Sequence, residues 1–155
     1  MAIRYPRGGE GSYTGSDWHG RNQGTVVSHR AGKDVTFVTY GTLLDNVMSA
    51  ANVLSEQGIE ATVLRLLSVS DIDAEQILEK MAKDSPVIVA EEVCSGSGIR
   101  EALFWELRKK KPDCRVEGID LGSGFVTHGS QQKLYEICGL DSVSIAAFAK
   151  EVLSK

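Results

Sequence analysis

The chain has 155 residues, of which 42% are hydrophobic and 25% are charged, and its net charge is −4. This apolar fraction excludes a disordered chain, the length suits one domain, and the charge argues against a nucleic-acid or anionic-membrane partner. No apolar run approaches the ~20 residues that span a bilayer, and no signal sequence is visible. The three cysteines, Cys94, Cys114 and Cys138, are far apart. Their spacing argues against a disulfide framework and fits a cytoplasmic protein.

The first 24 residues differ from the rest of the chain. Glycine is dense from Gly8 to Gly24, and aliphatic side chains are absent there. Such a composition supplies neither helical nor strand periodicity, so we expect a linker. Residues 2–7, which precede this linker, are expected to be separate from the packed domain. The packed domain is therefore expected over residues 25–155.

The first half of this domain predicts three strands and one helix. Residues 25–29 form a short β-branched run, and residues 35–40 are apolar enough for a buried strand. Leu44 begins a series of apolar residues at i, i+3, i+4 and i+7, which predicts a helix that ends near Gly58. Residues 61–67 then read as another buried strand.

The second half continues the alternation. Asp73, with Gln76 three places on, resembles a capping box and predicts the start of a helix. Residues 86–90, Pro-Val-Ile-Val-Ala, are the clearest strand in the sequence. The remaining elements are expected to be a helix from Ile99 to just before Pro112, a strand over 114–119, and helices over 131–138 and 142–154.

Strands and helices that alternate with short connections predict right-handed crossovers and a parallel sheet between two layers of helices. The first strand is an exception, because the turn at residues 31–34 is short enough to suggest an antiparallel neighbour. We therefore expect a three-layer α/β/α fold. Its sheet would have about five mostly parallel strands and one antiparallel edge strand, paired with the second strand.

Ligands usually bind at the carboxyl ends of parallel strands, where the loop at residues 91–98 is the first candidate. Gly96-Ser97-Gly98 before a helix resembles half of a dinucleotide fingerprint, with helix amides for a phosphate, and Glu117 or Asp120 lies where a ribose-binding acid would be. However, Glu101 replaces the third glycine, and its charge would face a pyrophosphate. The prediction is a structural turn that caps the helix, and a free-standing nucleotide-binding module stays open as the alternative.

Other candidate groups at this edge have ordinary structural uses. Glu91 and Glu92 could act as acid and base, but adjacent residues leaving a strand point to opposite sides, so salt-bridging or helix-capping roles are expected. Cys94 near a helix N-terminus could be a nucleophile with His128 as its base, although nothing in the sequence fixes that pair. Ser130 suits a helix N-cap. No motif of the packed domain specifies a chemistry by itself.

Six segments carry a family resemblance. They are Arg4-Tyr5-Pro6-Arg7-Gly8, Thr39-Tyr40-Gly41-Thr42, Val63-Leu64-Arg65 with Asp71-Ile72-Asp73, Val89-Ala90-Glu91-Glu92, Phe125-Val126-Thr127-His128-Gly129-Ser130, and Gly139-Leu140-Asp141. In order and spacing they resemble 1-deoxy-D-xylulose-5-phosphate synthase, a thiamine-diphosphate-dependent relative of transketolase. The first segment resembles the end of the family's pyrimidine-binding domain, and the others resemble its C-terminal domain.

Two departures from the family pattern indicate a divergent member. The family's proline before Leu-Asp is missing, since the chain reads Ser70-Asp71-Ile72-Asp73, and the glycine-rich loop after Glu92 is shorter than usual. A split transketolase or the β subunit of a 2-oxoacid dehydrogenase is therefore kept as the alternative. The Arg-Tyr-Pro-Arg-Gly segment favours the synthase-like branch.

The resemblance implies a transferase that joins pyruvate to glyceraldehyde 3-phosphate in isoprenoid precursor synthesis. Thiamine diphosphate and magnesium would be held by a pyrimidine-binding and a diphosphate-binding domain, so no cofactor, metal or catalytic residue is expected in this chain. Residues 1–24 would be the tail of the pyrimidine-binding domain plus a linker, and residues 25–155 the transketolase C-terminal domain.

The same resemblance implies a role for Arg7, and a weaker one for Arg4, in binding the phosphate of glyceraldehyde 3-phosphate, a task that suits a guanidinium. In this chain alone both would be solvated charges. We therefore expect an excised or split C-terminal domain that is inactive alone. It would pack against the two other domains and belong to a homodimer in the full enzyme, with no nucleic-acid or membrane partner.

Overall fold

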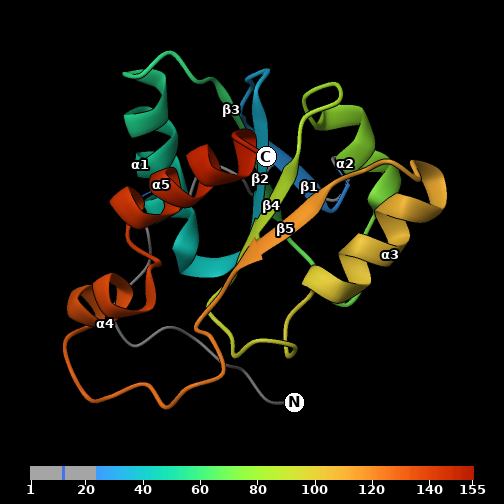
Figure 1. Cartoon of the computed structure of the whole chain (residues 1–155). Coiled ribbons are helices and arrows are strands. Elements are labelled where there is room, and N and C mark those ends of the chain that lie inside the picture. Colours follow the sequence, from blue (N-terminus) through green and yellow to red (C-terminus); the bar gives the residue numbers. More distant parts are fainter. Residues whose placement is uncertain (1–11, 13–23) are drawn as a thin grey trace.

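The computed structural model describes Ser12 and residues 24–155, where strands and helices alternate (Figure 1). The strands are β1 (Val26–Arg30), β2 (Val35–Thr39), β3 (Ala61–Leu66), β4 (Val87–Ala90) and β5 (Val116–Ile119). The helices are the 3₁₀ turn η1 (Gly41–Leu43), α1 (Leu44–Ser55), α2 (Ala74–Lys80), α3 (Arg100–Lys110), α4 (Gln131–Cys138) and α5 (Ser142–Leu153). The predicted strands and helices are confirmed, with shifts at their ends. Within the described residues, no helix combines the length and apolar character needed to cross a membrane.

The five strands form one sheet in the order β1-β3-β2-β4-β5. The pairs β2–β3, β2–β4 and β4–β5 are parallel, and β1 runs antiparallel to β3 at the edge. The predicted mostly parallel sheet with one antiparallel edge strand is therefore confirmed. The predicted pairing of β1 with β2 is wrong, because β3 lies between them.

The turn at residues 31–34 explains this difference, since it crosses over the start of β3. The amide of Gly32 donates to Thr62 Oγ1 at 2.9 Å, and the same hydroxyl donates to the Gly32 carbonyl at 3.0 Å. Asp34 N donates to the Glu60 carbonyl at 2.9 Å, and Glu60 N donates back to Asp34 Oδ2 at 2.7 Å. A short turn can span two strand spacings of about 4.8 Å each, so turn length alone does not choose the neighbour.

Helices cover both faces of the sheet (Figure 1). α1 and α5 share a core with one face, and α2 and α3 share a second core with the other. Consecutive side chains of β2 show how both cores form, because Phe37 lies in the first and Val38 in the second, each fully buried. The three-layer α/β/α architecture is thus confirmed.

Polar caps start three of the helices. Asp73 Oδ1 accepts from Gln76 N at 3.0 Å, as the capping box predicts, and hydrogen bonds from Gln76 lower the pKa of this carboxyl. Ser130 Oγ accepts from Lys133 N at 3.4 Å, which confirms the predicted N-cap of α4. Asp141 caps α5 in the same way.

Candidate functional site

The parallel strands end at one edge of the sheet, where the loops after β4 and β5 gather (Figure 1). We call this the carboxyl edge. It includes Tyr40 after β2, residues 91–99 after β4 and residues 120–130 after β5. In open parallel sheets this is where a ligand binds, so its polar groups decide what the domain can do.

Glu91 is the buried centre of the carboxyl edge, with only 3% of the residue exposed. Its carboxylate accepts hydrogen bonds from Ile99 N at 2.8 Å, Arg100 N at 3.2 Å and the Tyr40 hydroxyl at 3.1 Å. A carboxylate is stabilised there because the first amides of a helix have no partner within the helix and carry partial positive charge. The helix-capping role expected for Glu91 is confirmed.

This contact fills the place that a phosphate would need. The amides at the start of α3 already donate to Glu91. Gly98 packs so closely against that carboxylate that a Cβ atom on it would clash with the carboxylate oxygens. The contacts therefore make Gly96-Ser97-Gly98 a structural turn that brings Glu91 under the helix, and they argue against the nucleotide-binding alternative.

Tyr40 is held in its neutral form beside Glu91. Burial is the largest cause, and with the charge and the hydrogen bond of Glu91 it raises the pKa of Tyr40 from 10.0 to about 12. The phenol therefore stays protonated near neutral pH and donates to Glu91. A group with such a pKa is poorly matched to general base catalysis at neutral pH, so its role here is structural.

A second polar network ties β5 to the start of α3. Arg100 Nη2 donates to Glu101 Oε1 at 2.6 Å, and its Nη1 lies 3.5 Å from Asp120 Oδ2. The hydrogen bond to Glu101 and then the nearby acidic charges raise the pKa of Arg100. Asp120 also accepts from Ser95 Oγ at 2.6 Å. Gly118 makes this network possible, because a Cβ atom there would clash with the Arg100 side chain.

Glu91 and Glu92 serve different helices. Glu92 Oε2 accepts from the Tyr135 hydroxyl of α4 at 2.9 Å, and that hydroxyl accepts from Gln131 Nε2 at 2.8 Å. Burial, followed by the hydrogen bond and charge of Glu92, raises the pKa of Tyr135. The two glutamates thus bind α3 and α4 separately and form no acid–base pair, as the alternation of strand residues predicts.

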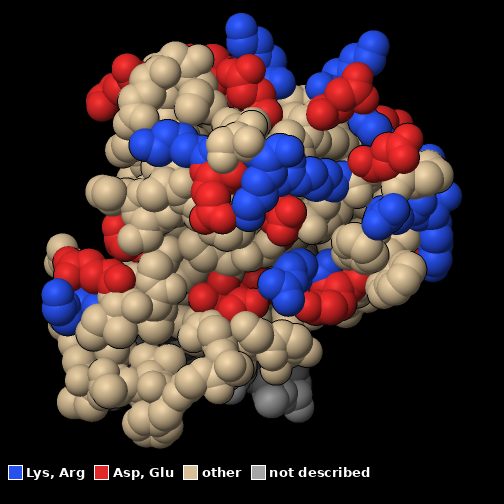
Figure 2. Space-filling view, viewed as in Figure 1, with Lys and Arg blue, Asp and Glu red and all other residues tan. Residues whose placement is uncertain are grey.

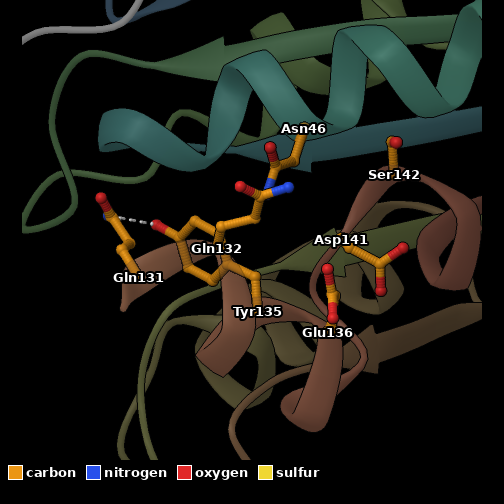
Figure 3. A pocket seen from close by; sticks show the side chains of 7 residues that line it. All are labelled: Asn46, Gln131, Gln132, Tyr135, Glu136, Asp141 and Ser142. Carbon is orange, nitrogen blue, oxygen red and sulfur yellow. Dashed lines mark hydrogen bonds between the residues drawn. The ribbon is translucent and has the colours of Figure 1, made fainter. Parts of the chain in front are cut away.

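A shallow pocket of about 440 Å³ lies beside Tyr135, between α1, α4 and the start of α5 (Figure 3). Its lining consists of amide, carboxylate, phenol and hydroxyl groups, from Asn46, Gln131, Gln132, Tyr135, Glu136, Asp141 and Ser142. Some of these groups already have partners, since Asn46 Nδ2 donates to the Leu140 carbonyl at 2.8 Å and Asp141 caps α5. The pocket offers hydrogen bonds rather than a nucleophile and its base.

The other predicted candidates do not assemble into a site. Cys94 and His128 are both exposed, and no hydrogen bond joins them in the part of the chain that the structure describes. Over Ser12 and residues 24–155, no group of three His, Cys, Asp or Glu side chains could hold a metal ion. Arg4 and Arg7 lie outside the described residues.

The sequence predicted no role in the site for Tyr40, which it placed only in a family segment, or for Arg100. Tyr40 is 51 positions from Glu91, and the two meet because β2 and β4 are neighbours in the sheet. The sequence does contain a signal for this contact: a tyrosine directly follows one buried strand, and a glutamate directly follows another. It becomes specific only when the strand order is known.

The chain matches known proteins over most of its length. Residues 24–145 match the family described as "Transketolase, C-terminal domain". The 1-deoxy-D-xylulose-5-phosphate synthase of Gloeobacter violaceus is 33% identical over 99% of this chain and 24% of its own length, and that of Heliobacterium modesticaldum is 30% identical over 98% and 24%. The chain thus spans about a quarter of the length of these curated relatives.

Solved structures agree with the family match. A split-gene transketolase, described as an inactive β4 tetramer, is 26% identical with a TM-score of 0.69 over 83% of this chain and 41% of that chain. A transketolase from Pichia stipitis is 17% identical with a TM-score of 0.62, over 84% of this chain and 18% of its own, and shares the fold. The family match over most of the chain and the shared architecture together show that this chain belongs to the family of transketolase C-terminal domains.

Proposed function

We propose that this chain is the architectural C-terminal domain of a cytoplasmic, thiamine-diphosphate-dependent transferase of the 1-deoxy-D-xylulose-5-phosphate synthase kind. One observation carries the architectural role: Glu91 already occupies the helix amides that a phosphate-bearing ligand would use at the carboxyl edge. The catalytic groups would come from a pyrimidine-binding and a diphosphate-binding domain, against which this domain packs in a homodimeric enzyme.

The described residues do not fit thiamine diphosphate or magnesium. Magnesium takes oxygen ligands gathered around one point, and no cluster of three suitable acidic, His or Cys side chains exists over Ser12 and residues 24–155. A diphosphate at the start of α3 would meet the carboxylate of Glu91 instead of free amides. Both groups therefore belong, in this proposal, to the partner domains.

Calorimetry tests whether the chain by itself binds the cofactor. Titration of the 155-residue chain with thiamine diphosphate and magnesium should give no saturable heat. The related split-gene transketolase that is described as an inactive β4 tetramer supports this expectation. A micromolar binding site would contradict the architectural role.

The acceptor substrate would be recognised through Arg7, with Arg4 as the weaker candidate, and this proposal rests on the Arg-Tyr-Pro-Arg-Gly segment. The test is a hybrid enzyme in which this chain replaces the matched quarter of the Gloeobacter violaceus synthase. Arg7→Ala should raise the KM for glyceraldehyde 3-phosphate about tenfold or more and leave the KM for pyruvate unchanged, because a bidentate charged hydrogen bond to phosphate is lost. An unchanged KM for glyceraldehyde 3-phosphate would remove Arg7 from the site.

A split transketolase is the second candidate, favoured by the 26% identity to the split-gene protein. Mixing experiments distinguish the synthase-like enzyme from the split transketolase. The chain is mixed either with the remainder of the Gloeobacter violaceus synthase or with the partner polypeptide of the split-gene transketolase. Recovery of ketol transfer only in the second mixture would favour the split transketolase.

A further inference from the structure

We propose that Phe125, Val126 and Ile137 form the surface on which this domain docks the domain that precedes it in the full enzyme. We call this group the Phe125 surface. The inference rests on the proposed function and deepens it, since it names the residues that make the contact between domains.

Phe125 and Ile137 are exposed, Val126 is half-buried, and none of the three belongs to either core cluster of the domain. Phe125 is 95% exposed and Ile137 is 61% exposed. Together with Val126, Leu121 and Cys138 they line a cleft of about 290 Å³ between the loop after β5 and α4. Asp120 also lines this cleft, and its carboxylate is already held by Ser95 and Arg100. Exposed apolar side chains that gather around a cleft, unlike scattered ones, mark interaction sites on folded proteins.

The charge distribution supports the same conclusion. Residues 121–132 contain no Lys, Arg, Asp or Glu, although 25% of the whole chain is charged. In Figure 2 the lower part of the molecule, where Figure 1 places the loop before α4, is largely uncharged, whereas charges cover the upper and right-hand parts. The centres of protein interfaces are depleted of charges and enriched in aromatic residues.

A second exposed aromatic residue shows the contrast. Trp105 on α3 is 64% exposed, but Arg108 and Lys109 line the same shallow depression. Arg108 stacks over the neighbouring Phe104 ring at 5.1 Å. This aromatic group is flanked by cations that keep it compatible with water, which makes Trp105 a matched control for Phe125.

The position of Ser12 indicates which partner covers the Phe125 surface. Ser12 N donates to Asp45 Oδ2 at 2.9 Å, at the first turn of α1. The next residue, Asn46, shares the pocket of Figure 3 with Gln131 and Tyr135 of α4, the helix that carries Ile137. α1 begins just after the carboxyl end of β2, so Ser12 lies at the carboxyl edge, from which the loop that carries Phe125 also extends.

The rest of the enzyme is expected at that same edge. The chain belongs to a family of C-terminal domains and spans about a quarter of its relatives' length, so most of the enzyme would precede this domain. A domain joined by a short connection is held at a high effective concentration near its attachment point. The preceding, pyrimidine-binding domain is thus the partner within reach of the Phe125 surface.

Binding measurements test this assignment. The remainder of the Gloeobacter violaceus synthase, without its matched quarter, is immobilised, and the affinity of the 155-residue chain is measured by biolayer interferometry. Phe125→Ser and Ile137→Ser should each weaken binding about tenfold or more, as expected for apolar residues at the centre of an interface, and Trp105→Ser should leave it unchanged. Circular dichroism checks that all three variants stay folded.

The outcomes separate this inference from the proposed function. Absence of binding by the wild-type chain would contradict the proposed function. Wild-type binding that withstands both Phe125→Ser and Ile137→Ser would contradict only the Phe125 surface. Light scattering on the chain alone tests whether the Phe125 surface instead binds a second copy of the chain. A dimer that dissociates in Phe125→Ser would assign the surface to that second copy and overturn the inference.

Discussion

The loops after β4 and β5 leave neighbouring strands at the same edge of the sheet and use it in opposite ways. The first folds back onto its own domain, with Glu91 buried at 3% exposure and bound by three donors. The second is hydrogen-bonded to the first near its start, through Asp120, Leu121 and Gly122, and then carries Phe125 into solvent at 95% exposure. Residues 91–99, the closed loop, therefore stabilise the domain. Residues 120–130, the open loop, pack Leu121 against the core but leave the Phe125 ring exposed.

Glu91→Ala should break the closed loop with the largest effect. It removes the acceptor for Ile99 N, Arg100 N and the Tyr40 hydroxyl and leaves buried donors unpaired, so unfolding free energy should fall by about 3 kcal/mol or more. Urea denaturation followed by circular dichroism measures this loss. The control is Glu92→Ala, whose exposed contact with Tyr135 should be worth less than about 1 kcal/mol. Equal losses of unfolding free energy in Glu91→Ala and Glu92→Ala would contradict the view that the buried Glu91 cap stabilises the domain more than the exposed Glu92 contact.

Gly98→Ala should also open this loop, with a smaller effect. The new methyl group would clash with the Glu91 carboxylate, so the turn or the cap must shift, at a cost of about 2 kcal/mol. Gly124→Ala is the matched control in the other loop, because nothing lies within 4 Å of a Cβ atom there. Thermal denaturation should therefore show a lower Tm for Gly98→Ala and a small change for Gly124→Ala.

Tyr40→Phe should cost about 1 kcal/mol, the usual value of one hydrogen bond, and should change the response to alkali. Below about pH 10 Tyr40 is protonated in both the folded and the unfolded chain. Between pH 10 and about 12 it ionises only in the unfolded chain, because its folded pKa is about 12, so wild-type stability falls over this range.

Denaturation at several alkaline pH values tests this point, with absorbance of the four tyrosines as a second measure. The fall in stability between pH 10 and 12 should be shallower in Tyr40→Phe than in the wild type. Parallel pH curves for the two proteins would show that Tyr40 is not held in its neutral form by the closed loop.

Phe125→Ser should have the smallest effect on the domain itself. Because the ring is almost wholly exposed, the unfolding free energy should change by no more than about 0.5 kcal/mol. Urea denaturation beside Glu91→Ala provides the comparison. A loss above about 2 kcal/mol would show that Phe125 packs within its own domain and that the second loop is closed as well.

Local patterns along the chain predict the elements because each depends on neighbours in sequence. The period of α1, the Asp73 cap and the apolar run of β4 are all visible without tertiary information. The strand that pairs with β1 cannot be identified in this way, since the turn at residues 31–34 suits either a hairpin or a crossing over β3. That choice depends on contacts with Glu60 and Thr62, which lie about 30 residues further along the chain.

The candidate site follows the same division. Alternation along a strand was enough to separate Glu91 from Glu92, whereas the contact of Glu91 with Tyr40 required the order of β2 and β4. The sequence did not predict the exposure of Phe125, because the side chain of a phenylalanine in a glycine-rich loop can equally well be buried in the hydrophobic core. Arg4 and Arg7, which the family resemblance singles out, lie outside the described residues and stay a prediction.

The crossing of the 31–34 turn over β3 has a consequence for aggregation. β1 is the strand that covers the outer edge of β3, and it does so through pairs such as Val26 with Leu66 and Ser28 with Leu64. If β1 detached, the apolar segment Ala61–Leu66 would present unpaired amides and carbonyls to any other strand. The antiparallel strand at this edge therefore keeps the apolar segment Ala61–Leu66 from pairing with another copy of itself.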